Sequence, residues 1–103
     1  MELPIVRRTV VIRDVDPLGL HVRPANLLVQ LAMKRQCRIE ILRDTLRVDA
    51  RSILDVLTLG AEPGAELVLE AQGEDAEAAI DELTRYVESG FTDYELLRQK
   101  PAT

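Results

Sequence analysis

The sequence predicts an α+β fold, an open-faced β-sandwich in which three helices cover one face of a four-stranded antiparallel sheet. Some segments alternate between apolar and polar residues, as strands do, and in others apolar residues recur every 3–4 positions, as in helices. Along the chain these segments follow the order β-α-β-β-α-β-α. The 103 residues are enough for one domain, and 47% of them are hydrophobic while only 3% are aromatic. The core is therefore expected to be aliphatic.

The first strand and the first helix are separated by a loop. Residues 5–13 are rich in β-branched residues and predict a strand, and residues 14–20 contain Pro and Gly and predict a loop. Residues 22–34 predict a helix, because Pro24 is tolerated in a first helical turn and apolar residues then recur at 3–4 spacing. The core face of this helix is expected to consist of Ala25, Leu28, Leu31 and Ala32.

A hairpin and a short helix follow. Residues 37–41 and 46–50 both alternate with period two, and the short gap between them predicts a hairpin with one apolar and one polar face. Ser52 and Asp55 stand in the capping-box pattern that begins a helix. Gly60 is placed to end that helix.

The last strand and helix complete the domain. Residues 65–71 predict a strand, and the acidic residues at 74–75 favour the start of a helix. The core face of that helix is expected to consist of Ala76, Ile80, Leu83, Val87 and Phe91. We expect residues 1–91 to form the domain and residues 92–103 to form a polar C-terminal tail whose start can be a helical turn.

Composition and charge exclude several classes of function. A net charge of −5 and the scarcity of aromatic residues disfavour binding to nucleic acid or to an anionic membrane. The single cysteine, Cys37, excludes an intrachain disulfide and predicts a buried small hydrophobe in a reducing compartment. The chain shows no secretory signal and no long apolar run, so we expect a cytoplasmic protein without membrane insertion. One cysteine and one histidine are too few for a structural metal cage, and we expect a monomer without metal or cofactor.

The single histidine, His21, immediately precedes the first predicted helix. Imidazole is an available nucleophile near neutral pH, and a helix N-terminus offers unpaired N–H groups and partial positive charge to a phosphoryl group. Arg23 adds a permanent cation that can hold phosphate oxygens. From spacing alone, however, a histidine that caps the helix or packs against it is the more common case.

Two motifs resemble those of a known family. Residues 19–25 (GLHVRPA) resemble the active-centre signature of HPr, the histidine phosphocarrier of the bacterial sugar phosphotransferase system, and residues 50–60 (ARSILDVLTLG) resemble the second signature, around a serine. The resemblance continues through residues 63–64 to residues 73–75 and covers roughly 5–91. The element order read from periodicity agrees with the fold that this resemblance implies.

The resemblance implies a relay and not a self-contained enzyme. His21 would accept, on its Nδ1 nitrogen, a phosphoryl group that enzyme I takes from phosphoenolpyruvate, and would pass it to an EIIA domain for sugar uptake. Arg23 would contact the phosphoryl group, while Val22 and Pro24 would shape its site. An alternative is an HPr paralogue with a mainly regulatory role, in a nitrogen-type or kinase-linked system, and a further one is a binding module that lost the chemistry.

The second motif carries a possible modification site and part of a docking patch. Ser52 is a good N-cap by its position, and the resemblance also permits phosphorylation by an HPr kinase/phosphorylase. The resemblance further implies that outward residues of the two helices bind enzyme I and EIIA; these are Val22, Asn26, Leu27, Gln30, Ile53, Leu54 and Leu57. Core packing is the alternative for the residues of the short helix. The patch is less basic than in many family members, because Gln30, Met33 and Asp55 stand within it.

Overall fold

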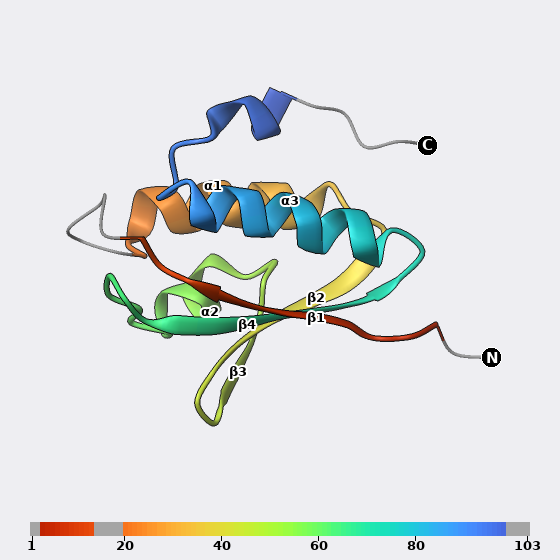
Figure 1. The fold of residues 1–103 in the computed structure, drawn as a ribbon, viewed down its shortest axis with the longest axis horizontal. Coiled ribbons are helices and arrows are strands. Elements are labelled where there is room, and N and C mark those ends of the chain that lie inside the picture. Colours follow the sequence, from red (N-terminus) through yellow and green to blue (C-terminus); the bar gives the residue numbers. More distant parts are fainter. Residues whose placement is uncertain (1–2, 14–19, 99–103) are drawn as a thin grey trace.

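The computed structural model describes residues 3–13 and 20–98, and its elements follow the predicted order (Figure 1). The elements are β1 (Val6–Val11), α1 (Val22–Met33), β2 (Cys37–Arg43), β3 (Leu46–Asp49), α2 (Ile53–Leu57), β4 (Glu66–Gly73), α3 (Ala76–Glu88) and a 3₁₀ helix, η1 (Tyr94–Arg98). The predicted loop over 14–20 lies outside the described residues except for its last position.

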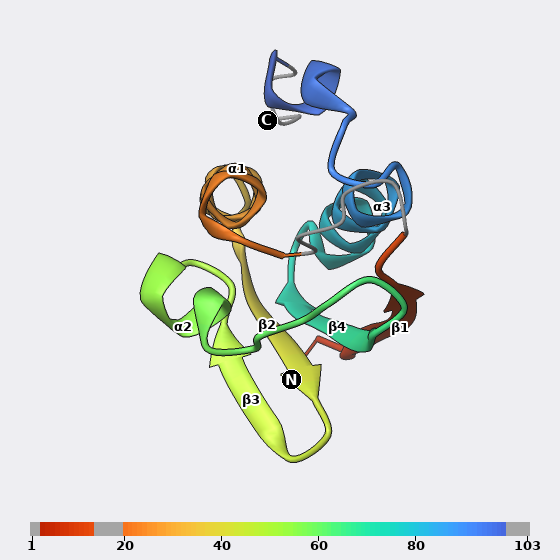
Figure 2. The same cartoon turned by 90° about the vertical axis from the view of Figure 1, so that its left-hand side faces the viewer.

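The sheet and the helices form two layers. The strand order is β1-β4-β2-β3 and every neighbouring pair is antiparallel. α1 and α3 lie side by side on one face of the sheet, as Figure 2 shows. The predicted α+β open-faced sandwich is therefore confirmed.

The core lies between the helix layer and the sheet. All nine residues that the 3–4 spacing assigned to the core faces of α1 and α3 are buried. Inward residues of the strands, among them Val10, Ile39, Ile41 and Leu69, complete it. The core is mainly aliphatic, but its largest fully buried side chain is Tyr86, whose ring centroid lies 5.5 Å from that of Phe91.

The hairpin extends further than its period-two pattern predicts. β2 continues to Arg43, and only Asp44 and Thr45 remain for the turn, with Asp44 in the left-handed region at φ 53°. Because the tip of this hairpin points away from the helix layer (Figure 1), Leu46 is exposed although its pattern places it on the apolar face. The ends of these two strands are set by pairing with a neighbouring strand, which cannot be predicted from the periodicity of one segment.

A close backbone approach joins the end of β4 to the start of β2. Gly73 pairs with Cys37 and has φ +147°. A Cβ at this position would lie 2.6 Å from Cys37 Cβ and 2.7 Å from Cys37 Cα, which is closer than side chains pack. The predicted burial of Cys37 is confirmed. Burial and a hydrogen bond with Asp75 raise the pKa of its thiol to about 12, so the thiol stays protonated.

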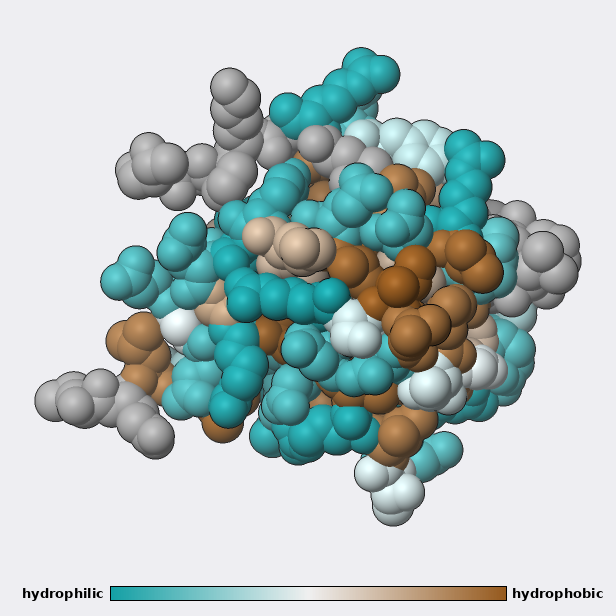
Figure 3. Space-filling view, turned by 180° about the vertical axis from the view of Figure 1, so that it is seen from behind, coloured by the Kyte–Doolittle hydropathy of each residue, from teal (hydrophilic) through white to brown (hydrophobic). Residues whose placement is uncertain are grey.

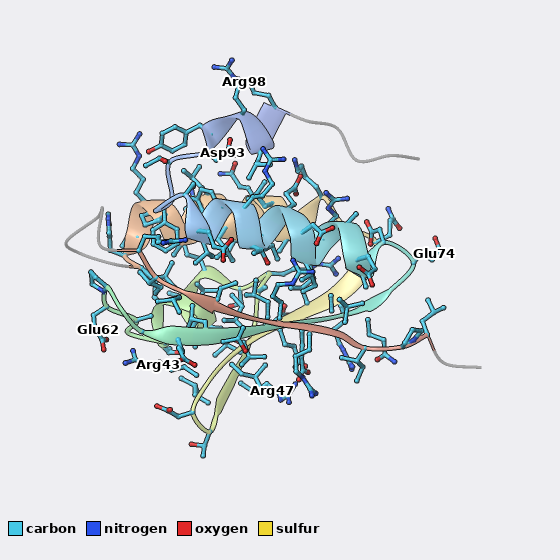
Figure 4. All side chains as sticks on the ribbon, viewed as in Figure 1. Arg43, Arg47, Glu62, Glu74, Asp93 and Arg98 are labelled. Carbon is cyan, nitrogen blue, oxygen red and sulfur yellow. The ribbon has the colours of Figure 1, made fainter. Side chains whose placement is uncertain are left out.

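The open face of the sheet is covered by charged side chains from all four strands. Glu70 of β4 is almost fully buried there, although it faces away from the helices. Arg7 donates to its Oε2 at 2.7 Å, and Arg47 bridges its Oε1 and the Oε1 of Glu40, at 2.8 Å each (Figure 4). Since Glu40 and Glu70 are direct cross-strand partners, Arg47 separates two carboxylates that would otherwise repel.

Replacing Arg47 by methionine is expected to flatten the acid dependence of stability. The hydrogen bond from Arg47 is the main cause that lowers the pKa of Glu70, with Arg7 adding to it and burial opposing it. A lowered folded-state pKa stabilises the fold above the ordinary glutamate value of about 4.5, and this stabilisation is lost as the pH falls below it. Urea unfolding at pH 7 and at pH 4 measures the difference, which should shrink in Arg47→Met. An unchanged difference would contradict the prediction.

Candidate functional site

His21 is the N-cap residue of α1. Its backbone is extended, with φ −115° and ψ −170°, and its carbonyl accepts a hydrogen bond from Ala25 N at 2.9 Å. Within the part of the chain that the structure describes, the imidazole makes no side-chain capping hydrogen bond to the backbone of α1. The side chain is half-buried. Among the described residues, no side-chain capping bond supports the alternative in which the imidazole caps the helix, and the alternative in which it packs against the helix stays a prediction.

The first turn of α1 presents backbone donors beside the imidazole. The N–H groups of a first helical turn have no partner within the helix. Pro24 has no N–H, and Ala25 N is paired with the His21 carbonyl, so Val22 and Arg23 supply the donors of this turn. The turn contains no acidic residue that would compete with an anion. The arrangement suits an anionic group next to His21.

A pocket of about 160 Å³ opens at this end of α1. Its lining residues are His21, Arg23, Pro24, Leu27, Phe91 and Tyr94. The first four belong to the predicted active-centre segment and its helix, and the last two follow α3. The Arg23 guanidinium carbon lies over the Tyr94 ring, 5.8 Å from its centroid. Imidazole, guanidinium and helix end thus border one small open space.

Tyr86 supports this site from within the core. Its hydroxyl donates to the carbonyl of Pro24 across a buried contact of 3.3 Å, which links α3 to the first turn of α1. Phe91 N donates to the Tyr86 carbonyl at 3.1 Å, and Phe91 takes a left-handed backbone with φ 65°. These contacts direct the chain after α3 toward the pocket.

The residues predicted for docking lie beside the site on α1 and α2. Val22 is 63% exposed and Leu54 is 75% exposed, which is unusual for large apolar side chains. Figure 3 shows an apolar area on the α1 and α2 side of the molecule. Asn26 and Gln30 are exposed, and the half-buried members, which are Leu27, Ile53 and Leu57, also pack against the core.

Ser52 caps α2. Its Oγ accepts a hydrogen bond from Asp55 N at 3.3 Å, as the capping-box pattern predicts. Its own N–H donates to the Asp49 carbonyl at 3.1 Å, which takes the place of the reciprocal capping-box bond to the Asp55 carboxylate. At the other end, Arg43 donates to the carbonyl of Gly60 at 2.8 Å and pairs with Glu62 (Figure 4).

Sequence reasoning missed the aromatic side of the site. Phe91 was assigned to the core only, and residues 92–103 were assigned to a polar tail. The structure instead brings Tyr94 over Arg23 and buries Leu96. The signal that could have pointed to this segment is the cluster of Tyr94, Leu96 and Leu97 within a mostly polar stretch. The boundary between residues 91 and 92 stays a prediction.

Comparison with known proteins finds close relatives. A protein-family model described as "PTS HPr component phosphorylation site" matches residues 6–89. The chain is 38% identical over 82 residues to phosphocarrier protein HPr of Treponema pallidum, covering 80% of this chain and 93% of that protein. It is 39% identical over 70 residues to the HPr-like protein Crh of Bacillus subtilis, covering 68% of this chain and 82% of that protein.

Solved structures agree with the sequence relatives. The crystal structure of HPr-C-His from Thermoanaerobacter tengcongensis superposes with a TM-score of 0.79 at 38% identity, covering 85% of this chain and 97% of that one. That of HPr from Bacillus anthracis superposes with a TM-score of 0.76 at 34% identity, covering 81% and 96%.

Proposed function

Because the chain belongs to the HPr family of phosphocarrier proteins, we propose that His21 relays a phosphoryl group from phospho-enzyme I to EIIA domains for sugar uptake. The observation that carries the proposal is the pocket that His21 shares with Arg23 at the N-terminus of α1. In the region that the structure describes, no helix is long and apolar enough to cross a membrane. We place the relay in the cytoplasm.

The chemistry proposed is a reversible substitution at phosphorus. The lone pair of an imidazole nitrogen forms a P–N bond, and the bond between phosphorus and the donor protein breaks with its electron pair leaving to the donor. The backbone N–H groups of Val22 and Arg23 and the Arg23 guanidinium stabilise the phosphoryl oxygens. Transfer to the acceptor repeats the substitution in reverse, with His21 as leaving group.

An open site suits a carrier better than a deep one. The stored group must be stable enough to survive between two encounters and accessible enough for the next protein to remove it. The half-buried imidazole meets both needs, and the apolar side chains of Val22 and Leu54 offer a docking surface beside it. We propose that enzyme I and EIIA bind there in turn, each to the monomeric carrier.

The test is phosphorylation of the purified chain by enzyme I and labelled phosphoenolpyruvate. We expect one phosphoryl group per chain, with the label lost in acid and stable in base, and its transfer to an added EIIA domain. Because the sequence has one histidine, a phosphohistidine signal assigns the label to His21. An unlabelled chain beside a control HPr that the same enzyme I phosphorylates would overturn the proposal.

Replacing Arg23 by alanine is expected to slow phosphoryl transfer by about 10- to 100-fold, the effect of losing one hydrogen-bonded charge worth about 1.5–3 kcal/mol. The side chain is exposed, so the midpoint of thermal unfolding should hardly change. Stopped-flow transfer kinetics and circular dichroism measure the two effects. Arg38→Ala, which removes an exposed arginine on β2, is the matched control and should transfer normally. Equal rates for the two variants would contradict the assigned role of Arg23.

A regulatory role is the second candidate. Relatives include the HPr-like protein Crh of Bacillus subtilis, and a solved structure of Crh is described as that of a catabolite repression containing protein. Ser52 is half-buried at the start of α2, where a phosphate would face helix N–H groups but also the carboxylate of Asp55. Incubation with HPr kinase/phosphorylase and ATP tests it: an acid-stable label that is absent from Ser52→Ala would support the regulatory role, and no label would exclude that route.

A further inference from the structure

The segment after α3 turns back over the helix layer. α3 ends at Glu88, and η1 (Tyr94–Arg98) lies on the side of α1 and α3 that faces away from the sheet (Figures 1 and 2). This segment follows the region that the family model matches, which ends at residue 89. It therefore lies outside the part of the chain that the family model matches.

Specific contacts hold the segment in place. Leu96 is fully buried, and its carbonyl accepts a hydrogen bond from Lys34 Nζ of α1 at 2.7 Å. Asp93 pairs with Arg85 of α3 at 3.0 Å (Figure 4). Ser89 Oγ accepts from two backbone N–H groups, those of residues 92 and 93, at 3.1 Å each. The buried side chain of Leu96, together with the bonds to α1 and α3, fixes the position of η1 on the helix layer.

That placement brings Tyr94 to Arg23. The guanidinium carbon lies 5.8 Å from the centroid of the Tyr94 ring, within the range of a cation–π interaction. Both side chains line the pocket that contains His21. An exposed arginine has many rotamers, and ordering it at the moment of reaction costs free energy. A ring that already holds the guanidinium lowers this cost, while the N–H donors stay available for phosphoryl oxygens.

We propose that Tyr94 is a positioning residue for phosphoryl transfer, which acts through Arg23 by holding its guanidinium at the pocket beside His21. The inference rests on the proposed function of His21 and adds to it a contribution from outside the region that the family model matches. We do not expect the contact between Tyr94 and Arg23 to change the affinity for enzyme I, because the proposed apolar docking surface lies on α1 and α2.

The kinetic test compares Tyr94→Leu with Tyr94→Phe, using enzyme I and phosphoenolpyruvate. We expect Tyr94→Leu to lower kcat about two- to fivefold, the factor that corresponds to ~0.5–1 kcal/mol for an exposed cation–π pair, with KM for the carrier unchanged. Tyr94→Phe keeps the ring and should retain the rate. Glu95→Gln, at the neighbouring exposed position, is the control and should also retain it.

A double-mutant cycle tests whether the effect passes through Arg23. In an Arg23→Ala background, Tyr94→Leu should cause no further loss of rate. An equal loss in both backgrounds, a loss confined to KM, or wild-type kinetics in Tyr94→Leu would each overturn the proposal. If the wild-type chain is not phosphorylated at all, the proposed function fails, and this inference fails with it. If the wild-type chain is phosphorylated and Tyr94→Leu has wild-type kinetics, only this inference fails.

NMR of the unphosphorylated protein gives a readout that does not depend on transfer. The ring current of Tyr94 should shift the Arg23 side-chain protons, and this shift should be present in Tyr94→Phe and lost in Tyr94→Leu. Leu96→Ala, which removes the buried side chain of η1, should lose it as well. An Arg23 shift that is the same in all variants would show that the ring does not hold the guanidinium.

Discussion

Replacing His21 by alanine is expected to abolish phosphoryl acceptance and to leave the fold intact. The imidazole is the only one in the sequence, so no second histidine can accept the group in its place. The carbonyl of this residue accepts a hydrogen bond from Ala25 N whichever side chain is present, so the start of α1 keeps this bond. Label incorporation should fall to background, while the unfolding midpoint in circular dichroism should stay within a few degrees.

The chemistry of any remaining label identifies its origin. A phosphoserine is stable in acid, whereas a phosphohistidine is not, so an acid wash separates modification at Ser52 from modification at His21. His21→Gln, which keeps a polar side chain of similar size, is the matched control and should be equally inactive. Acid-labile label on either variant would mean that His21 is not the acceptor.

Replacing Gly73 by alanine should destabilise the fold by about 3–5 kcal/mol. A backbone at φ +147° is strained for any residue with a Cβ, at about 1–3 kcal/mol, and forcing atoms into a packed region costs a similar amount. The added Cβ would collide with the Cα and Cβ of Cys37 rather than with a movable side-chain end, so the β2–β4 pairing itself must shift. Urea denaturation at pH 7 measures the free energy of unfolding.

Gly60→Ala is the control for this prediction. Gly60 has φ +55°, in the left-handed region that other residues can reach, and a Cβ there would meet no described atom within 4 Å. Its replacement should cost only about 1 kcal/mol. If the two alanine variants were equally stable, the close approach of Gly73 to Cys37 would have no energetic importance.

Periodicity predicted most of the fold because most elements bury one face against a single core. The 3–4 spacing of α1 and α3 and the alternation of the strands follow directly from that arrangement, and residues such as Leu28 and Ile80 are fully buried as predicted. The strand ends were less predictable, since pairing with a neighbouring strand carries β2 past the edge of the core to Arg43. Leu46 shows the same limit, because its pattern cannot reveal that the hairpin tip lacks a covering helix.

The site was predictable only where it is local in sequence. His21, Arg23 and Pro24 lie within four residues of one another, so a motif can contain them. Tyr94 lies about seventy positions further along and reaches Arg23 through the packing of η1 on α1. Its placement depends on Leu96 and on the bond from Lys34, which no spacing rule describes.

The two outer strands of the sheet have a consequence for how the protein behaves beside other copies of itself. β1 and β3 stand at the edges of the strand order, where unpaired backbone groups can recruit a strand from another molecule. β3 is only four residues long, and β1 carries two adjacent arginines, Arg7 and Arg8. Short, charged borders are poor templates for aggregation, which favours a dispersed protein even though Val22 and Leu54 are exposed.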